Sequence, residues 1–223
     1  MVQKCESRLA TINRLVERSA KRVLDAHKAA LSLLQKPTAL ESIVIPLKSL
    51  EEEEEARIVD EEVIETIALC SPTSSQLRQL IAYIKLVEEI LRIGRYAKSY
   101  AKNITPHLEV DRSLFPLSLY IQQLHESAIE AFKRALEILE SEDETHMETL
   151  ARKAKVEESK TDEIFTMLKE ELTTQPSTKN ERLMESLHLL FACRKLERTA
   201  DRAAKIAHLA ILAKRGEKLA NFQ

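Results

Sequence analysis

The sequence predicts an all-α protein of two tandem three-helix bundles, with six long helices related by pseudo-twofold symmetry. The 223 residues include only two glycines and 4% aromatic side chains, so the residues typical of tight hairpins and packed strands are scarce. Ala, Leu, Glu, Lys and Arg, which lose little conformational entropy in a helix, fill most of the chain. Six prolines divide it into long periodic segments, and the order of these segments in the first half recurs in the second.

The first helix is predicted at residues 4–34, where apolar side chains recur with helical spacing. Charged side chains fall away from this stripe, as in an amphipathic helix that packs against a core. The stripe comprises Leu9, Ile12, Val16, Val23, Ala30, Leu31 and Leu34. Residues 35–48, which contain Pro37 and Pro46, are apolar but too short for another long helix, and we interpret them as a buried connector.

Two further helices complete the first half. One is predicted at residues 49–70, with an acidic run in its first turns that complements the positive end of the helix dipole. The other opens after the proline turn at residues 71–73, and Pro106 is expected to end it. These helices define a predicted first bundle at residues 1–105.

The second half repeats this plan with helices of similar length. They are predicted at residues 114–141, 143–173 and 177–215. Gly216 follows the last of them at the position that a left-handed C-cap favours. Residues 103–113 mix polar and apolar side chains without periodicity and form the expected boundary between the halves. The second bundle is therefore predicted at residues 113–223.

The charge balance argues against nucleic acid and membranes as direct ligands. The chain carries 34 basic and 36 acidic residues, so it has no global field that attracts polyanions. The N-terminal segment is charged where a signal peptide is apolar, and no apolar run reaches about 18 residues. Three widely spaced cysteines argue against a disulfide framework or a thiolate zinc site, and they favour a reducing compartment. We expect a soluble, cytoplasmic protein that reaches a membrane only through a partner.

Each half carries the same series of motifs. In the first half Asp60 precedes a proline turn, a Leu-Arg pair and the segment ILRIGRYAKSYA. In the second half Asp162 precedes a proline turn, a Glu-Arg pair and the segment KLERTADRAAKIA. These motifs, in two copies and in register, resemble the repeat of the PhoU family, whose helix reads approximately LERIGDxAxxIA. The resemblance covers most of the chain after the first helix and implies a PhoU-like helical fold.

The resemblance also implies a metal site, made by acidic residues spaced four positions apart on the second and third helices of a bundle. Residues i and i+4 lie one above the other on a helix, so two such pairs on adjoining helices present oxygen ligands to one cation. The second half retains both pairs, and the predicted ligands are Glu158, Asp162, Glu197 and Asp201. Iron, zinc, manganese and magnesium are all compatible with carboxylate ligands. Cys193, one turn before Glu197, is interpreted as a small buried hydrophobe.

The first half has lost this pattern. The equivalent positions hold Ala56 with Asp60 and Leu91 with Arg95, so three of four carboxylates are missing and a guanidinium is present. We expect Arg95 to pair with Asp60, in a first bundle that is purely structural. The alternative for the second half is a solvated or salt-bridged face, because 31% of all residues are charged. The basic neighbours available for such pairs are Arg198, Lys160 and Arg202.

By this resemblance the chain is a non-enzymatic regulator of phosphate transport and phosphate signalling, which binds a phosphate transporter or a membrane sensor kinase. No Ser-His-Asp order, phosphate-binding loop or nucleic-acid module is recognisable, so the sequence nominates no catalytic or cofactor-binding residue. The long apolar helices favour a homodimer. Three alternatives stay open: an accessory module for another cation transporter or channel, a metal-dependent enzyme, and a metal-free helical scaffold.

Overall fold

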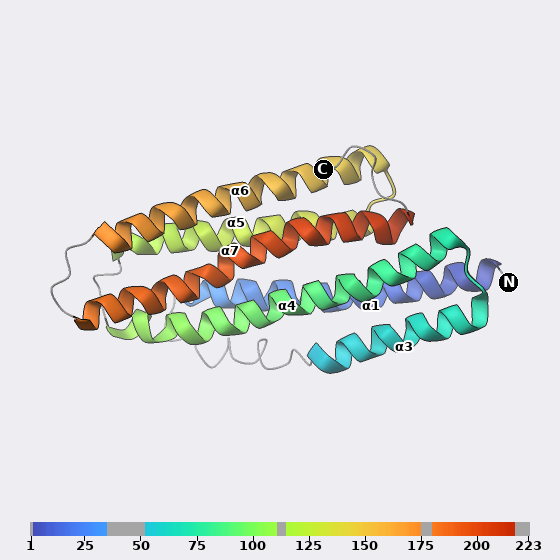
Figure 1. Cartoon of the computed structure of the whole chain (residues 1–223), viewed down its shortest axis with the longest axis horizontal. Coiled ribbons are helices and arrows are strands. Elements are labelled where there is room, and N and C mark those ends of the chain that lie inside the picture. The colour runs from blue at the N-terminus through green and yellow to red at the C-terminus, as the bar shows by residue number, and fades with distance from the viewer. Residues whose placement is uncertain (1, 35–51, 111–114, 175–179, 217–223) are drawn as a thin grey trace.

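The computed structural model describes residues 2–34, 52–110, 115–174 and 180–216, and all regular structure in these ranges is helical. The helices are α1 (Val2–Ser32), α3 (Glu52–Cys70), α4 (Ser74–Val110), α5 (Phe115–Glu140), α6 (Glu144–Thr174) and α7 (Asn180–Arg215). They run along the long axis of an elongated molecule (Figure 1). The predicted all-α fold with six long helices is confirmed. The connector predicted at residues 35–48 lies outside the described ranges.

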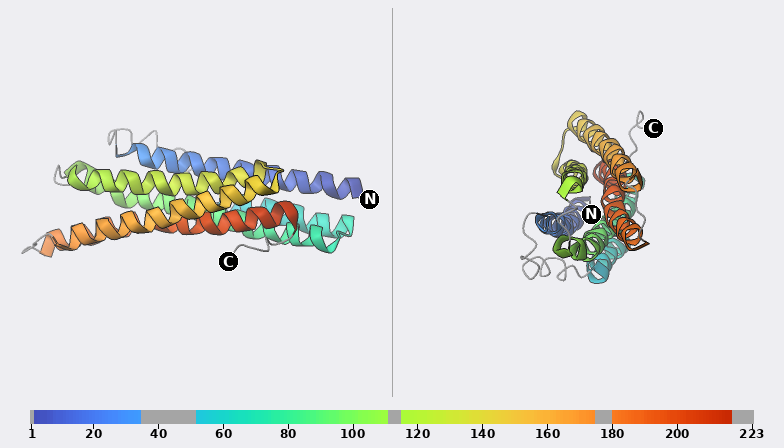
Figure 2. Two further views of the ribbon diagram at one scale, coloured as in Figure 1. Left: turned by 90° about the horizontal axis from the view of Figure 1, so that it is seen from above. Right: turned by 90° about the vertical axis from the view of Figure 1, so that its left-hand side faces the viewer.

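The helices pack as two groups of three. Within each group every helix contacts the other two: α1, α3 and α4 form one group, and α5, α6 and α7 form the other. In the described part of the chain the main contacts between the groups are an extensive one between α4 and α7 and a smaller one between α1 and α5. Both join helices from equivalent places in the two halves, as a pseudo-twofold axis requires. Viewed end-on, the second group stacks on the first (Figure 2).

Polar side chains cap the N-terminal ends of α4 and α6. At the start of α4 the Gln76 backbone N–H donates to Thr73 Oγ1 at 3.3 Å, and the Thr73 N–H donates to Gln76 Oε1 at 3.0 Å. Asp143 caps α6 by accepting hydrogen bonds from the backbone N–H groups of Thr145 and His146, each at 3.2 Å. Local sequence therefore determines where these two helices start.

The prediction that Pro106 ends the third helix is wrong, because α4 continues through it to Val110. Proline removes one hydrogen bond to the preceding turn. In that turn a side chain bonds a neighbouring carbonyl: Thr105 Oγ1 donates to the Ala101 carbonyl at 2.7 Å. Ile104 is completely buried and holds this last part of the helix against the core. The helix therefore passes the end predicted for the first bundle.

The start of α4 caps the end of α7. Gly216 adopts a left-handed φ of +68°, as predicted, and its N–H donates to the Leu212 carbonyl at 2.8 Å. Gln79 Nε2 donates to the Lys214 carbonyl at 2.6 Å, and Arg78 Nε donates to the Gly216 carbonyl at 2.5 Å. The last carbonyls of a helix have no partner within it. Side chains of α4 supply these partners and set the register between the two helices.

A buried carboxylate also joins α4 to α7. Glu89 is 6% exposed and accepts hydrogen bonds from Arg202 Nη1 at 3.0 Å and from Lys205 Nζ at 2.6 Å. Burial by itself raises the pKa of Glu89, but the two cations outweigh it, and the pKa is lowered. Glu89 therefore stays ionised at neutral pH and ties the two groups of helices together.

Two histidines form a buried polar contact where α1 meets α5. His27 and His125 are both completely buried, and His27 Nδ1 lies 3.2 Å from His125 Nε2. His27 Nε2 lies 3.2 Å from the Ile93 carbonyl, which can only accept, so His27 carries its proton on Nε2 and His125 donates from its own Nε2. Burial lowers the pKa of His27 to about 4 and that of His125 well below its ordinary value. Both rings are therefore neutral at physiological pH.

None of the helices in the described ranges combines the length and the apolar character that crossing a bilayer requires.

The buried histidines make stability depend on pH. Unfolded histidine takes up a proton near pH 6.5, whereas folded His27 does so only near pH 4, so acidification favours the unfolded chain. We expect the free energy of unfolding to be about 2 kcal/mol lower at pH about 5 than near pH 7, because His27 can take up a proton at the lower pH only in the unfolded chain. Urea unfolding near pH 7 and pH 5 measures this loss. In NMR spectra two of the six histidine rings should still be neutral at pH about 5. If all six rings took up a proton above that pH, the buried histidine pair would be contradicted.

Replacing Glu89 should weaken the contact between α4 and α7. Glu89→Gln is expected to lower the free energy of unfolding by roughly 1–2 kcal/mol, because a neutral amide cannot offset the two cations. Glu88→Gln removes the same charge from the exposed side of α4 and should change stability by less than about 0.5 kcal/mol. Urea titrations compare the variants, and equal stability of the two would argue against a joining role for Glu89.

Candidate metal centre

Three carboxylates meet where α6 contacts α7. One oxygen each from Asp162 of α6 and from Glu197 and Asp201 of α7 lies within 4.8 Å of the other two. On α7 the completely buried Leu196 and Ala200 flank Glu197, so the packing of this face draws the Glu197 carboxylate inward. Glu197 is only 6% exposed, while Asp162 and Asp201 reach solvent. The helical spacing therefore brings residues from two helices together at one point.

Glu158, the fourth predicted ligand, lies beside this cluster. Its carboxylate accepts hydrogen bonds from Lys155 Nζ at 2.6 Å and from Ser159 Oγ at 3.3 Å. Burial and then repulsion from Glu158 raise the pKa of both Asp162 and Asp201, so its charge still reaches them. Of the four predicted residues, the structure places three in one cluster and the fourth next to it, held by a lysine.

The cluster has more negative charge and more acceptors than its neighbours satisfy. Burial, followed by repulsion from Asp201, raises the pKa of Glu197 to about 7. Glu197 Oε1 lies 2.6 Å from Arg194 Nη1, but Oε2 is buried without a hydrogen-bond partner among the described residues. Arg194 and Lys155 thus form two ion pairs with a group of four carboxylates. A bound cation would supply both the missing charge and a partner for Oε2.

The ion pairs at the cluster differ from those expected, although the charges of Arg198 and Arg202 still oppose the rise in the pKa of Glu197 and of Asp201, respectively. Lys160 lies 3.5 Å from Glu157, and Arg202 binds Glu89 on α4. Lys155 and Arg194 pair with the cluster instead, each three residues before a glutamate on its own helix. This i, i+3 spacing is a sequence signal that could have identified them.

The equivalent region of the first bundle has a different character. Leu91 belongs to the core, Ala56 packs against it, and Arg95 is exposed. Asp60 Oδ1 is buried without a hydrogen-bond partner in the described ranges. In those ranges no other group of three or more acidic, histidine or cysteine side chains converges as the cluster of the second bundle does. The pairing of Arg95 with Asp60 stays a prediction.

Cys193 takes no part in the acidic cluster. Its side chain is completely buried, and burial raises the pKa of its thiol to about 12. The thiol therefore stays protonated and packs as a small apolar group. The interpretation of Cys193 as a buried hydrophobe is confirmed.

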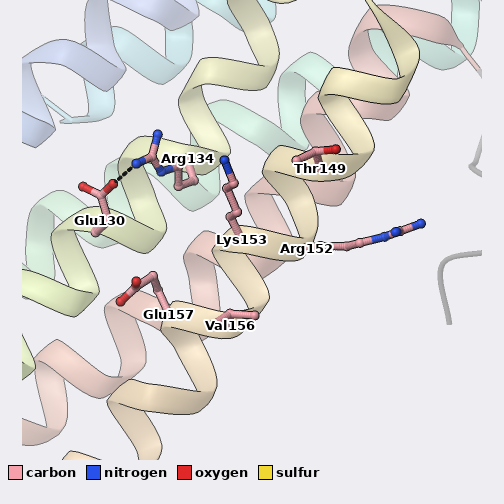
Figure 3. A pocket seen from close by; sticks show the side chains of 7 residues that line it. All are labelled: Glu130, Arg134, Thr149, Arg152, Lys153, Val156 and Glu157. Atoms are coloured by element: carbon pink, nitrogen blue, oxygen red, sulfur yellow. Dashed lines mark ion pairs between the residues drawn. The ribbon is translucent and has the colours of Figure 1, made fainter.

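A groove between α5 and α6 is lined by charged side chains, and Lys153 extends toward Arg134 across it (Figure 3). Arg134 is already ion-paired with Glu130 and with Glu137, the latter at 2.9 Å. Every residue that lines the groove is at least partly exposed, including Val156. It is a salt-bridged surface without a buried polar group for a ligand, unlike the carboxylate cluster.

Fold and site together define an all-helical protein of two three-helix groups, with one carboxylate cluster between two helices of the second. Residues 121–210 of this chain match the PhoU domain. This match confirms the resemblance to the PhoU family seen in the motifs of the chain.

The chain is also similar to proteins named as PhoU homologs and to one solved structure. A phosphate-specific transport system accessory protein PhoU homolog from Xylella fastidiosa is 28% identical over 158 residues, which cover 69% of this chain and 62% of that relative. The PhoU homolog 1 from Methanothermobacter thermautotrophicus is 26% identical over 206 residues, which cover 90% of this chain and 89% of that relative. The chain thus spans less than two thirds of the Xylella relative. The crystal structure of PhoU from Pseudomonas aeruginosa aligns with 97% of this chain and 98% of its own length, with a TM-score of 0.58 and 24% identity, and it supports the fold.

Glu197 should destabilise the protein when no metal is bound. Its folded pKa of about 7 exceeds its ordinary value of 4.5, so the folded state loses stability as the pH rises from 4.5 through 7. Glu197→Gln should therefore raise the melting temperature by a few degrees at alkaline pH and leave it unchanged below pH 4.5. Thermal unfolding with a chelator present measures this. Glu163→Gln, on the exposed side of α6, is the control, and a lower melting temperature for Glu197→Gln at alkaline pH would contradict the effect.

Proposed function

We propose that this chain is a non-enzymatic accessory regulator of a phosphate transport system, which acts by binding. The observation that carries the proposal is the PhoU domain at residues 121–210, together with relatives named as accessory proteins of phosphate-specific transport. The partner would be a phosphate transporter or a membrane sensor kinase, contacted at the cytoplasmic face. In this proposal the helical surfaces carry the interaction, and no residue acts as a nucleophile or a general base.

We further propose that the second bundle, residues 113–223, holds a metal ion and that the first, residues 1–105, is structural. Asp162, Glu197 and Asp201 would bind the ion, and Glu158 would complete the set. The fit is supported by three converging oxygens, by the buried Oε2 of Glu197, for which the described residues supply no donor, and by raised pKa values. Iron, zinc, manganese or magnesium would neutralise the carboxylates and link α6 to α7. Because the ion binds the folded protein, it would add to its stability.

Metal content tests this site. Purified wild-type protein, incubated with Mn²⁺, Zn²⁺, Fe²⁺ or Mg²⁺ and then desalted, should retain metal, while Glu197→Ala/Asp201→Ala should lose it. The matched control is Glu61→Ala/Glu65→Ala, which removes an exposed i, i+4 acidic pair from α3. Saturation at about 100 times the dissociation constant should stabilise the wild-type protein by about 2.7 kcal/mol. Equal metal content in all three proteins would show that the carboxylate cluster does not bind the metal.

The partner needs a separate test. Tagged full-length chain, expressed in its own cells, should co-purify with a component of a phosphate transporter or with a phosphate-sensing kinase, and loss of the chain should alter phosphate uptake. Co-purification with another cation transporter or channel would favour the alternative accessory role. Hydrolysis of a phosphate ester by the metal-loaded protein, lost in Glu197→Ala/Asp201→Ala, would instead support an enzyme. The homodimer stays a prediction, which light scattering tests.

A further inference from the structure

Ion pairs between α1 and α3 define how these two helices align. Arg8 Nη1 lies 3.2 Å from Glu65 Oε2, and Arg22, further along α1, forms an ion pair with Glu55, nearer the start of α3. Residues later in the sequence of α1 therefore lie beside residues earlier in the sequence of α3, so the two helices run antiparallel. The beginning of α1 must then lie beside the end of α3.

This alignment brings together two cysteines that are far apart in the sequence. Cys5 precedes Arg8 in the first turns of α1, and Cys70 is the last residue of α3. Both thiols are free, and Cys70 lies near enough to Cys5 to raise the pKa of its thiol. Cys5 is 2% exposed and Cys70 is 6% exposed, so the pair is shielded inside the end of the bundle. The alignment of the helices and the burial of both side chains place Cys5 and Cys70 together at one end of the α1–α3 pair.

We propose that Cys5 and Cys70 form a reversible oxidation site, which closes to an intramolecular disulfide by exchange with a low-molecular-weight disulfide such as glutathione disulfide. One thiolate attacks a glutathione sulfur and releases the first glutathione thiol. The second thiolate then attacks the protein sulfur of the mixed disulfide and releases the second glutathione thiol. The two protein thiols lose two electrons and two protons, and one glutathione disulfide becomes two thiols. This inference is independent of the phosphate-transport proposal.

Both cysteines lie at helix ends. Cys5 lies in the first turns of α1 and Cys70 is the last residue of α3, and helix ends open at a smaller free-energy cost than helix centres. Burial, followed by the hydrogen bond from Cys70, raises the pKa of Cys5. Because the thiolate is the reactive form, oxidation should require local opening and should accelerate as the pH rises.

The disulfide would fasten α3 to the rest of the bundle. The main contacts of α3 are with α1 and α4, and they are less extensive than those of the other helices. A link from Cys5 to Cys70 closes a long loop, which restricts the unfolded chain. We expect oxidation to raise the melting temperature by roughly 5–10 °C and to fix the C-terminal end of α3 against α1.

The test uses the full-length protein and glutathione disulfide. After incubation at mildly alkaline pH, the count of free thiols should fall from three to one. The intact mass should decrease by two hydrogen atoms, and peptide mapping without reductant should recover the Cys5 peptide joined to the Cys70 peptide. Addition of dithiothreitol should restore all three thiols and the original melting temperature.

Variants separate this pair from the third cysteine. Cys193→Ser should still form the disulfide, because Cys193 is completely buried on α7. Cys5→Ser and Cys70→Ser should not form it or gain stability. Peptide mapping of the wild-type protein decides the matter even where a variant fails to fold. The proposal is overturned if all three thiols stay free under conditions that oxidise the urea-unfolded chain, or if Cys5 and Cys70 each carry glutathione without joining.

Discussion

The antiparallel contact between α4 and α7 is the constraint on which the rest of the structure depends. Side chains at the start of α4 bind the last carbonyls of α7, and Glu89 holds Arg202 and Lys205 further along the same contact. These bonds fix both the register of α7 and its rotation about its own axis. With its basic face held against α4, α7 presents Glu197 and Asp201 to α6. The acidic cluster is thus positioned in part by the contacts that α7 makes with α4.

The two halves share one architecture but differ in the side chains at equivalent positions. In the first half Leu91 occupies an acidic position of the family motif and adds to the core. In the second half the Glu197 side chain is only 6% exposed, and one of its oxygens has no donor in the part of the chain that the structure describes. A buried charge of this kind destabilises the folded chain. Such a compromise is typical of functional sites, where local stability is lower than packing alone would allow.

Two other polar contacts link segments that are remote in sequence. The buried pair of His27 and His125 lies where α1 meets α5, and each ring remains neutral because burial lowers its pKa. The thiols of Cys5 and Cys70 meet at the end of the first bundle, where α1 and α3 run antiparallel. Each pair combines one residue of α1 with one residue of another helix. The first helix therefore makes contacts with α3, α4 and α5.

The sequence alone was enough for the fold class, the six helices and the family, because these rest on helical periodicity, on capping residues and on motifs repeated in register. It also placed the acidic pairs on one helix face, since residues four apart lie one turn apart. Tertiary structure decided the rest. Only packing shows that α4 passes Pro106, that Glu89 holds Arg202 and Lys205 of α7, and that Cys5 and Cys70 lie at the same end of their helix pair. The physical reason is that spacing along a helix fixes neighbours within it, whereas contacts between helices depend on how each is rotated and aligned against the others.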